Sequence, residues 1–217
     1  MTRRVPLPAA QPSRDGNPVR HESSTYAELI HVATELFGEL GYERTTVREI
    51  SKRMGMQSGS LYSHISSKDE LLEEIIRRVG SEFIARAQEA VARCDDPEQK
   101  LRELIAQHIQ VMHNYLPAVA VYFNEWTKLD EASRRSIVKL RREYEQIFAH
   151  VIRSGISQGK FRKVDVTVAV VWILSALNWT YQWYTPGGSQ SPRKLSEAYA
   201  DLLLSGLNAV TRSSQPL

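Results

Sequence analysis

Apolar residues recur every three or four positions along most of the chain, the spacing that gathers side chains on one face of an α-helix. No segment alternates apolar and polar residues on both sides of an Asn-Gly or Asp-Gly turn, so the pattern predicts no β-hairpins. We therefore expect an all-α fold of about nine helices.

Capping signals mark several helix starts. A hydroxyl residue three positions before a glutamate forms a capping box, in which the two residues satisfy each other's backbone amides. Such boxes precede the first, second and fourth predicted helices: Thr25 with Glu28, Thr46 with Glu49, and Ser67 with Glu70. A short third helix is expected over 57–63. Later helices are expected near 97–115, 117–128, 131–158, 166–184 and 192–211, with N-caps at Asp130, Asp165 and Ser191.

The longest uncharged stretch lies between Asp165 and Arg193, and its first half is mostly apolar. A membrane-spanning helix needs about 20 predominantly apolar residues. Asn178, Thr180 and Gln182 interrupt the second half, so we expect a helix buried at a subunit interface or around a ligand, and no membrane partner.

Composition sets limits without indicating a function. The 217 residues suffice for one large domain or two small ones, and the net charge of +3 permits DNA as a partner without requiring it. The single Cys94 excludes an internal disulfide and a cysteine-based zinc site. It suits the reducing cytoplasm, where we expect the protein to associate with the nucleoid. No metal and no other cofactor is expected.

No catalytic arrangement is evident. His108 and His113 are five positions apart, so they do not share a helical face, and neither has a carboxylate or cysteine at ligand spacing. The sequence therefore predicts no enzyme and no catalytic residue. Residues 1–22 contain four arginines among prolines without the apolar stretch of a secretory signal. We interpret them as a disordered basic arm, which either touches DNA phosphates or is a solvated leader.

Residues 46–64, TVREISKRMGMQSGSLYSH, have the form of a helix-turn-helix: a short amphipathic helix, a glycine-containing turn and a short polar helix that fits the major groove. In the second helix only Leu61, with Tyr62 and Ile65 in part, can anchor to a core. Its serines and its glutamine can hydrogen-bond base edges and phosphates. From Arg44 to Lys68 there are five basic residues and one acidic residue. The residues alone leave open a three-helix cap with a polar surface.

The stretch TTVREISKRMGMQSGSLYSHISSKDELL resembles the signature of the TetR family of repressors, over about 26–76. The resemblance implies a homodimer on a palindromic operator in double-stranded DNA, released by a small-molecule inducer. It implies three parts: an arm (1–22), a helix-turn-helix domain (23–70) and a helical ligand-binding and dimerisation domain (71–217). The DNA contacts it implies, with the basic Arg44 added, are Arg44, Thr46, Gln57, Ser58, Ser60, Tyr62, His64 and Lys68.

Three tryptophans, Trp172, Trp179 and Trp183, are spaced to share a helical face, which is either dimer core or a pocket wall. The segments NWTYQWYTPGG and VYFNEW resemble TetR-type regulators that respond to acyl-CoA thioesters in fatty-acid, aromatic-acid or steroid-side-chain degradation. The ligand-binding residues that this implies are Tyr122, Trp126, Ser175, Asn178, Trp179 and Gln182. Steroid-type members carry an arginine where this chain has Ser175, which argues against a steroid thioester.

The seventh predicted helix carries a basic run of Arg134, Arg135, Lys139, Arg141 and Arg142. This run is either a site for the phosphates of a CoA thioester or a solvated face paired with nearby glutamates. Other functions remain open: a TetR-type regulator of a drug or aromatic compound, an activator, or a helical interaction protein that does not bind DNA. We expect an inducer to act by tilting the fourth helix and spreading the recognition helices.

Overall fold

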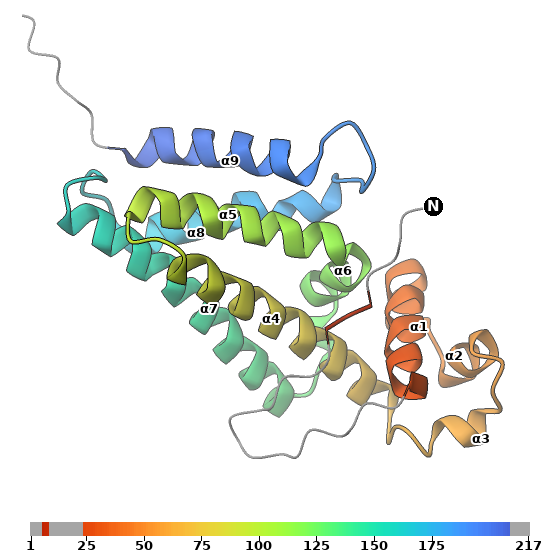
Figure 1. Cartoon of the computed structure of the whole chain (residues 1–217). Helices are drawn as coiled ribbons and strands as arrows, with labels where there is room; N and C mark the ends of the chain where they lie inside the picture. The colour runs from red at the N-terminus through yellow and green to blue at the C-terminus, as the bar shows by residue number, and fades with distance from the viewer. Residues whose placement is uncertain (1–5, 9–23, 209–217) are drawn as a thin grey trace, which may run out of the picture. The chain divides into compact units, whose positions relative to one another are not determined.

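The computed structural model describes residues 6–8 and 24–208, and all of their regular structure is helical (Figure 1). The α-helices are α1 (Ser24–Leu40), α2 (Val47–Arg53), α3 (Ser58–Leu61), α4 (Lys68–Ala92), α5 (Pro97–Asn114), α6 (Leu116–Asn124), α7 (Glu131–Ser157), α8 (Val166–Trp179) and α9 (Pro192–Leu207). Two 3-10 turns, η1 (Trp126–Lys128) and η2 (Thr180–Gln182), follow α6 and α8. The predicted all-α fold is confirmed. The predicted arm lies outside the described residues, except for residues 6–8.

Most predicted caps are present. The Thr46 hydroxyl accepts from the Glu49 amide at 3.2 Å, and the Glu49 carboxylate accepts from the Thr46 amide at 2.7 Å. The predicted N-caps Asp130, Asp165 and Ser191 each accept a backbone amide three residues on. The prediction for Thr25 is wrong, because α1 already includes Ser24 and Thr25 therefore lies inside the helix.

Two predicted helices are shorter than expected and continue as a 3-10 turn. At the end of α8 the Thr180 amide bonds the Leu177 carbonyl, three residues back. The Tyr199 hydroxyl donates to the Ala176 carbonyl at 3.2 Å, and the Thr180 hydroxyl lies 2.8 Å from Tyr199 Oη. These side-chain bonds occupy the carbonyl that the next α-helical bond would use.

The chain packs as two compact units, each described here by itself. Unit 1 comprises Met1–Ile84 and Val111–Arg142, and unit 2 comprises Ala85–Gln110 and Glu143–Leu217. In unit 1, α1 packs against α6 and α2. Figure 1 shows α9 (blue) alongside α8 and α5; α8, α9 and all of α5 except its last four residues belong to unit 2. The expected boundary after residue 70 separates the DNA-binding part from the ligand-binding part. It is a division by function, and it stays a prediction.

The core of unit 2 is apolar, with one buried histidine. Phe148, Ile152 and Leu177 are fully buried there. His108 is buried among them, and its Nδ1 lies 2.9 Å from the Tyr144 hydroxyl. Burial lowers the pKa of His108 to about 3, so the ring is uncharged at neutral pH. Nothing in the described residues brings three metal-ligating side chains together, and none of their helices is long and apolar enough to cross a membrane.

Candidate functional site

The predicted helix-turn-helix is present in unit 1 as α2, a glycine turn and α3. Gly55 has φ +68°, a left-handed conformation that glycine adopts without strain and that lets the chain turn between the helices. Ile50 of α2 and Leu61 of α3 are fully buried, and Ser51 Oγ lies 2.9 Å from Ser58 Oγ. Leu61 is the only buried residue of α3 and anchors this helix, while Ser58 is half-buried against Ser51, and Gly59 and Ser60 are exposed.

The residues that the sequence predicts to contact DNA lie mostly on the surface of unit 1. Arg44, Thr46, Gln57, Ser60 and Tyr62 are exposed, and Ser58, His64 and Lys68 are half-buried. Tyr62 stands out because 57% of its surface is exposed, although tyrosine usually buries its ring. An exposed aromatic hydroxyl beside short polar side chains is suited to hydrogen-bond phosphate oxygens. Direct DNA contact by these residues stays a prediction.

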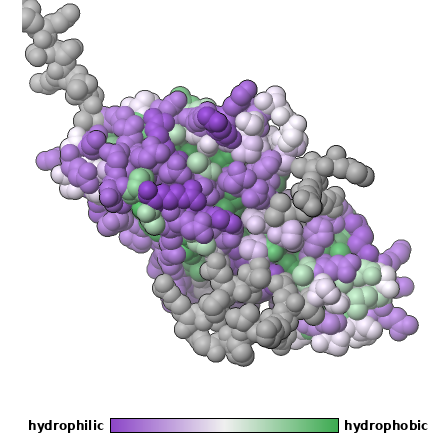
Figure 2. Space-filling model, in the orientation of Figure 1, coloured by the Kyte–Doolittle hydropathy of each residue, from purple (hydrophilic) through white to green (hydrophobic). Residues whose placement is uncertain are grey.

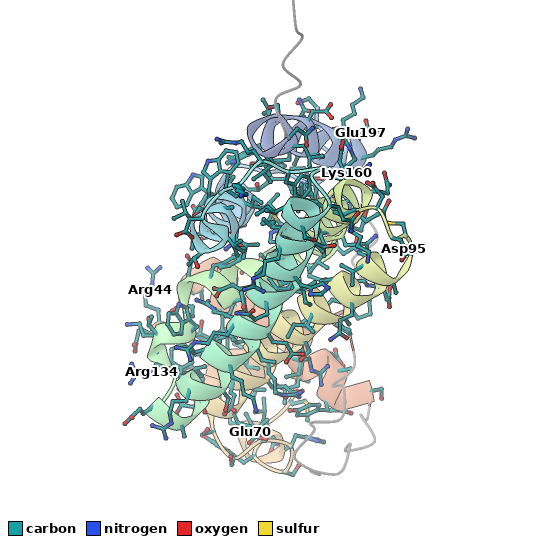
Figure 3. All side chains as sticks on the ribbon, turned by 90° about the vertical axis from the view of Figure 1, so that its left-hand side faces the viewer. Arg44, Glu70, Asp95, Arg134, Lys160 and Glu197 are labelled. Carbon is teal, nitrogen blue, oxygen red and sulfur yellow. The ribbon has the colours of Figure 1, made fainter. Side chains whose placement is uncertain are left out.

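Four basic positions surround this surface. Arg44, Arg48, Lys52 and Arg53 are all exposed, and Figure 3 shows the Arg44 side chain extending away from the ribbon. Arg53 pairs with Glu39 of α1 at 3.3 Å, but both side chains are about half exposed. Such a pair contributes about 0–1 kcal/mol to stability, so Arg53 can leave Glu39 and bind a DNA phosphate at little cost. The basic surface is thus accessible to a polyanion.

Lys68 has a structural role that sequence reasoning missed. Its ammonium group donates to the carbonyls of Tyr42 and Thr45, each at 2.9 Å, and lies 4.1 Å from the centre of the Tyr42 ring. The Tyr42 hydroxyl bonds Asp69, and burial together with this bond raises the pKa of Tyr42. Lys68 therefore holds the start of α4 against the segment between α1 and α2, with one ammonium hydrogen left for a phosphate.

Replacing Lys68 with methionine should destabilise the fold and weaken DNA binding together. The change keeps the apolar stem but removes a charged donor from two largely buried carbonyls, which costs about 1–3 kcal/mol. We expect the melting temperature to fall by roughly 2–4 °C per kcal/mol lost. The matched control, Lys52→Met on the exposed face of α2, should keep the melting temperature and lower only DNA affinity. An unchanged melting temperature in Lys68→Met would refute this role.

Tyr122 and Trp126, predicted to bind ligand, lie in unit 1 around an arginine. The Arg141 guanidinium carbon is 4.8 Å from the Tyr122 ring centre and 4.3 Å from the Trp126 ring centre. Arg141 also donates from Nη2 to the Tyr122 carbonyl at 3.2 Å. Sequence reasoning named all three residues but did not pair them.

The other members of the basic run on α7, Arg134, Arg135, Lys139 and Arg142, are exposed. Figure 3 shows Arg134 extending from the helix, and Arg135 pairs with Glu131 one turn back. For these four the structure favours a solvated face.

The remaining predicted ligand residues lie in unit 2, on or beside α8. Ser175, Trp179 and Gln182 are exposed, and Asn178 is half-buried. Trp179 belongs to a patch of exposed large apolar side chains that we call the α8–α9 face: Val168, Val171, Trp172, Trp179, Trp183 and Leu202. The Trp172 ring lies so near Gly206 of α9 that a Cβ there would be 3.2 Å from it, so the two helices are in close contact.

The α8–α9 face contains six of the seven exposed large apolar side chains in the described residues, the seventh being Tyr62. Hydrophilic side chains cover most of the face seen in Figure 2, whereas Figure 3 shows large side chains of α8 pointing outward at the left-hand edge. Trp179 is 64% exposed and Leu202 is 72% exposed. Val168, Val171, Trp172 and Trp179 lie at helical spacing along α8, and exposed apolar side chains gathered in this way mark an interaction site. Of the two interpretations of the tryptophans, exposure in the single chain favours a subunit interface, and ligand contact stays a prediction.

A helix-turn-helix joined to a larger helical part defines a class of DNA-binding transcriptional regulators. Residues 29–75 match the family described as bacterial regulatory proteins, tetR family, and residues 94–207 match the tetracyclin repressor-like C-terminal domain. The chain belongs to the TetR family of transcriptional regulators.

Similar proteins cover nearly the whole chain. The HTH-type transcriptional repressor KstR2 of Rhodococcus jostii (strain RHA1) is 31% identical over 188 residues, which are 86% of this chain and 92% of that protein. The structure of the ketosteroid transcriptional regulator KstR2 of Mycobacterium tuberculosis superposes with a TM-score of 0.81 at 26% identity, covering 94% of this chain and 99% of that one. The TetR family regulator PfmR of Thermus thermophilus gives a TM-score of 0.78 at 31% identity, covering 83% of this chain and 99% of that one.

Proposed function

We propose that this protein is a transcriptional repressor that binds a palindromic operator as a homodimer and releases it when a small-molecule inducer, an acyl-CoA thioester, binds. The observation that carries the proposal is the surface of α2 and α3, where exposed polar and basic side chains surround a short helix whose one buried residue is Leu61. The relatives named KstR2 are transcriptional repressors, which supports repression. The protein would act in the cytoplasm, where operator DNA lies.

The homodimer is argued from the α8–α9 face. A two-fold axis brings the same patch of two copies together, and two helices from each copy then form a four-helix interface. The exposed tryptophans and valines of α8 would be buried there. Two recognition helices about 34–36 Å apart would then enter successive major grooves on one face of DNA.

The ligand proposal rests on the resemblance of the segments around Trp126 and Trp179 to regulators that respond to acyl-CoA. The relatives named for ketosteroid regulation extend the candidate class to thioesters of larger ring acids. Ser175, which replaces the arginine of steroid-type members, favours a simpler acyl group. The ligand must bind the DNA-free state better than the DNA-bound state, because equal affinity for both would shift nothing.

A gel-shift titration of the protein on the DNA upstream of its own gene tests both parts. We expect tight binding. The logarithm of the association constant should fall linearly with the logarithm of the salt concentration, because DNA phosphates release their counterions when the protein binds them. One acyl chain class in a panel of CoA thioesters should release the DNA. Binding that no thioester relieves would keep the repressor and remove the CoA proposal. Absence of operator binding at low salt would refute the proposed function itself.

A further inference from the structure

Arg141 is a charged residue whose surroundings in unit 1 leave its hydrogen-bonding capacity largely unused. A guanidinium group carries five N–H donors, and here one bonds the Tyr122 carbonyl. Its Nε atom is buried and has no hydrogen-bond partner in the part of the chain that the structure describes. No ion pair joins Arg141 to a carboxylate among those residues, whereas Arg135 on the same helix pairs with Glu131.

Two aromatic rings hold this guanidinium in place. Tyr122 and Trp126 are four residues apart, at the end of α6 and the start of η1, and both ring centres lie within 5 Å of the guanidinium carbon. A cation over aromatic faces is stabilised by about 0.5–2 kcal/mol, the upper value applying when water is excluded. This partly offsets the cost of a buried donor without a partner, about 1–3 kcal/mol, but supplies no acceptor.

The support behind the aromatic pair is rigid. Tyr122 is buried, and its ring packs against Phe83 at 6.0 Å and Phe123 at 5.0 Å between ring centres. Gly80 of α4 packs on the same group, because a Cβ there would be 3.4 Å from both the Tyr122 ring and Leu140. The planar donor fork of Arg141 therefore has a fixed direction and a half-exposed surface on which a ligand can bind.

We propose that Arg141, between Tyr122 and Trp126, binds the anionic oxygen group of the effector, a phosphate or carboxylate attached to an apolar body. The inference rests on the proposed ligand response and names the residue that recognises charge in it. An arginine fork matches a carboxylate or a phosphate in two parallel hydrogen bonds, and the indole of Trp126 offers a flat apolar face to the adjoining carbon atoms. Neutral hydrophobic molecules would lack this contact.

Calorimetric titration of the purified full-length protein tests the inference. Octanoyl-CoA, CoA and octanoate serve as probes against the wild type, Arg141→Met, Arg141→Lys and the control Arg142→Met, which removes an exposed charge one position away. We expect Arg141→Met to weaken binding of the anionic probe by about tenfold or more, the effect of a lost charged hydrogen bond. Arg142→Met should stay within about threefold, and Arg141→Lys should fall between, because it keeps the charge and loses the fork.

The probes separate the two possible anions. Dependence on Arg141 with CoA and octanoyl-CoA identifies a phosphate, and dependence with octanoate identifies the carboxylate of a free acid. Equal affinity of wild type and Arg141→Met for every bound probe would overturn the inference, as would a wild type that binds none of them. If Arg141→Met melts well below the wild type, the affinity of Arg141→Lys for the probes is used instead, and an affinity equal to that of the wild type would overturn the inference.

Operator binding of the same preparations is measured separately. If probe binding does not depend on Arg141 but the protein binds its operator, the inference is wrong and the proposed function is retained. If probe binding depends on Arg141 but the protein does not bind its operator, the inference is retained and the proposed function is wrong.

Discussion

Replacing Trp179 with glutamate is expected to convert the proposed dimer into a monomer and to abolish tight operator binding. Trp179 is 64% exposed in the single chain. Burial of that surface in a dimer is worth roughly 3 kcal/mol per protomer at about 25 cal/mol per Å². The substitution loses this contribution in both copies and places two like charges at the interface, so dimer affinity should fall by at least about a thousandfold.

Sedimentation velocity over a concentration series measures the effect, and a gel-shift titration measures DNA affinity. The control is Gln88→Glu, which adds the same charge at an exposed position of α4 in unit 2. That variant should remain dimeric and bind DNA as the wild type does. A dimeric Trp179→Glu protein would show that the α8–α9 face is not the subunit interface.

Replacing Gly155 with alanine should be strongly destabilising, because Gly155 is the most tightly enclosed glycine in the part of the chain that the structure describes. A Cβ on Gly155 would be 2.1 Å from Phe161 Cδ2 and 2.4 Å from Cε2. Phe161 is buried, and its amide donates to the Gly155 carbonyl at 3.0 Å, so the ring cannot withdraw without disturbing the chain reversal after α7.

Two opposing effects decide the size of this change. Alanine favours a helix interior over glycine by about 0.5–1 kcal/mol. Overpacking typically costs about 1–3 kcal/mol, and a contact this short belongs at or above the upper end. We expect a net loss of about 2 kcal/mol, or roughly 4–8 °C in melting temperature at fixed protein concentration.

Gly59→Ala is the matched control, since it adds the same methyl to a helical glycine with no atom within 4 Å. Its melting temperature should be unchanged or slightly higher. The double variant Gly155→Ala with Phe161→Leu should recover part of the loss if the clash is the cause. A melting temperature of Gly155→Ala equal to that of the wild type would contradict the expected packing.

Local signals predicted much of the fold. The Thr46–Glu49 box and the N-caps at Asp130, Asp165 and Ser191 depend on residues within one helical turn, and they are present as expected. The end of α8 could not be predicted in this way. It depends on Tyr199 of α9, 23 residues away from the Ala176 carbonyl that it binds.

In the candidate sites, too, local features could be predicted from the sequence and long-range contacts could not. The polarity of α3 is visible in the sequence, because only Leu61 is apolar enough to anchor it. The role of Lys68 is not, since its carbonyl partners at Tyr42 and Thr45 lie more than 20 residues earlier. Among several similar basic residues on α7, nothing in the sequence distinguished Arg141, because only the fold places it against the rings of α6 and η1.

The sequence could have revealed more of the α8–α9 face than it did. Val168 and Val171 precede Trp172 and Trp179 at helical spacing, so they could have been grouped with the three tryptophans as one apolar stripe. Leu202 could not, because its exposure depends on how α9 packs in unit 2.

The positions of the tryptophans also give the protein an intrinsic optical signal. Trp172, Trp179 and Trp183 lie on the α8–α9 face and Trp126 lies beside Arg141, so no indole of this chain is fully buried. Indole emission shifts to longer wavelengths when water surrounds the ring. Dilution of a dimer below its dissociation constant should therefore shift the emission of the native protein to the red. Subsequent unfolding of the separated chains should move it much less, so fluorescence would report association more directly than folding.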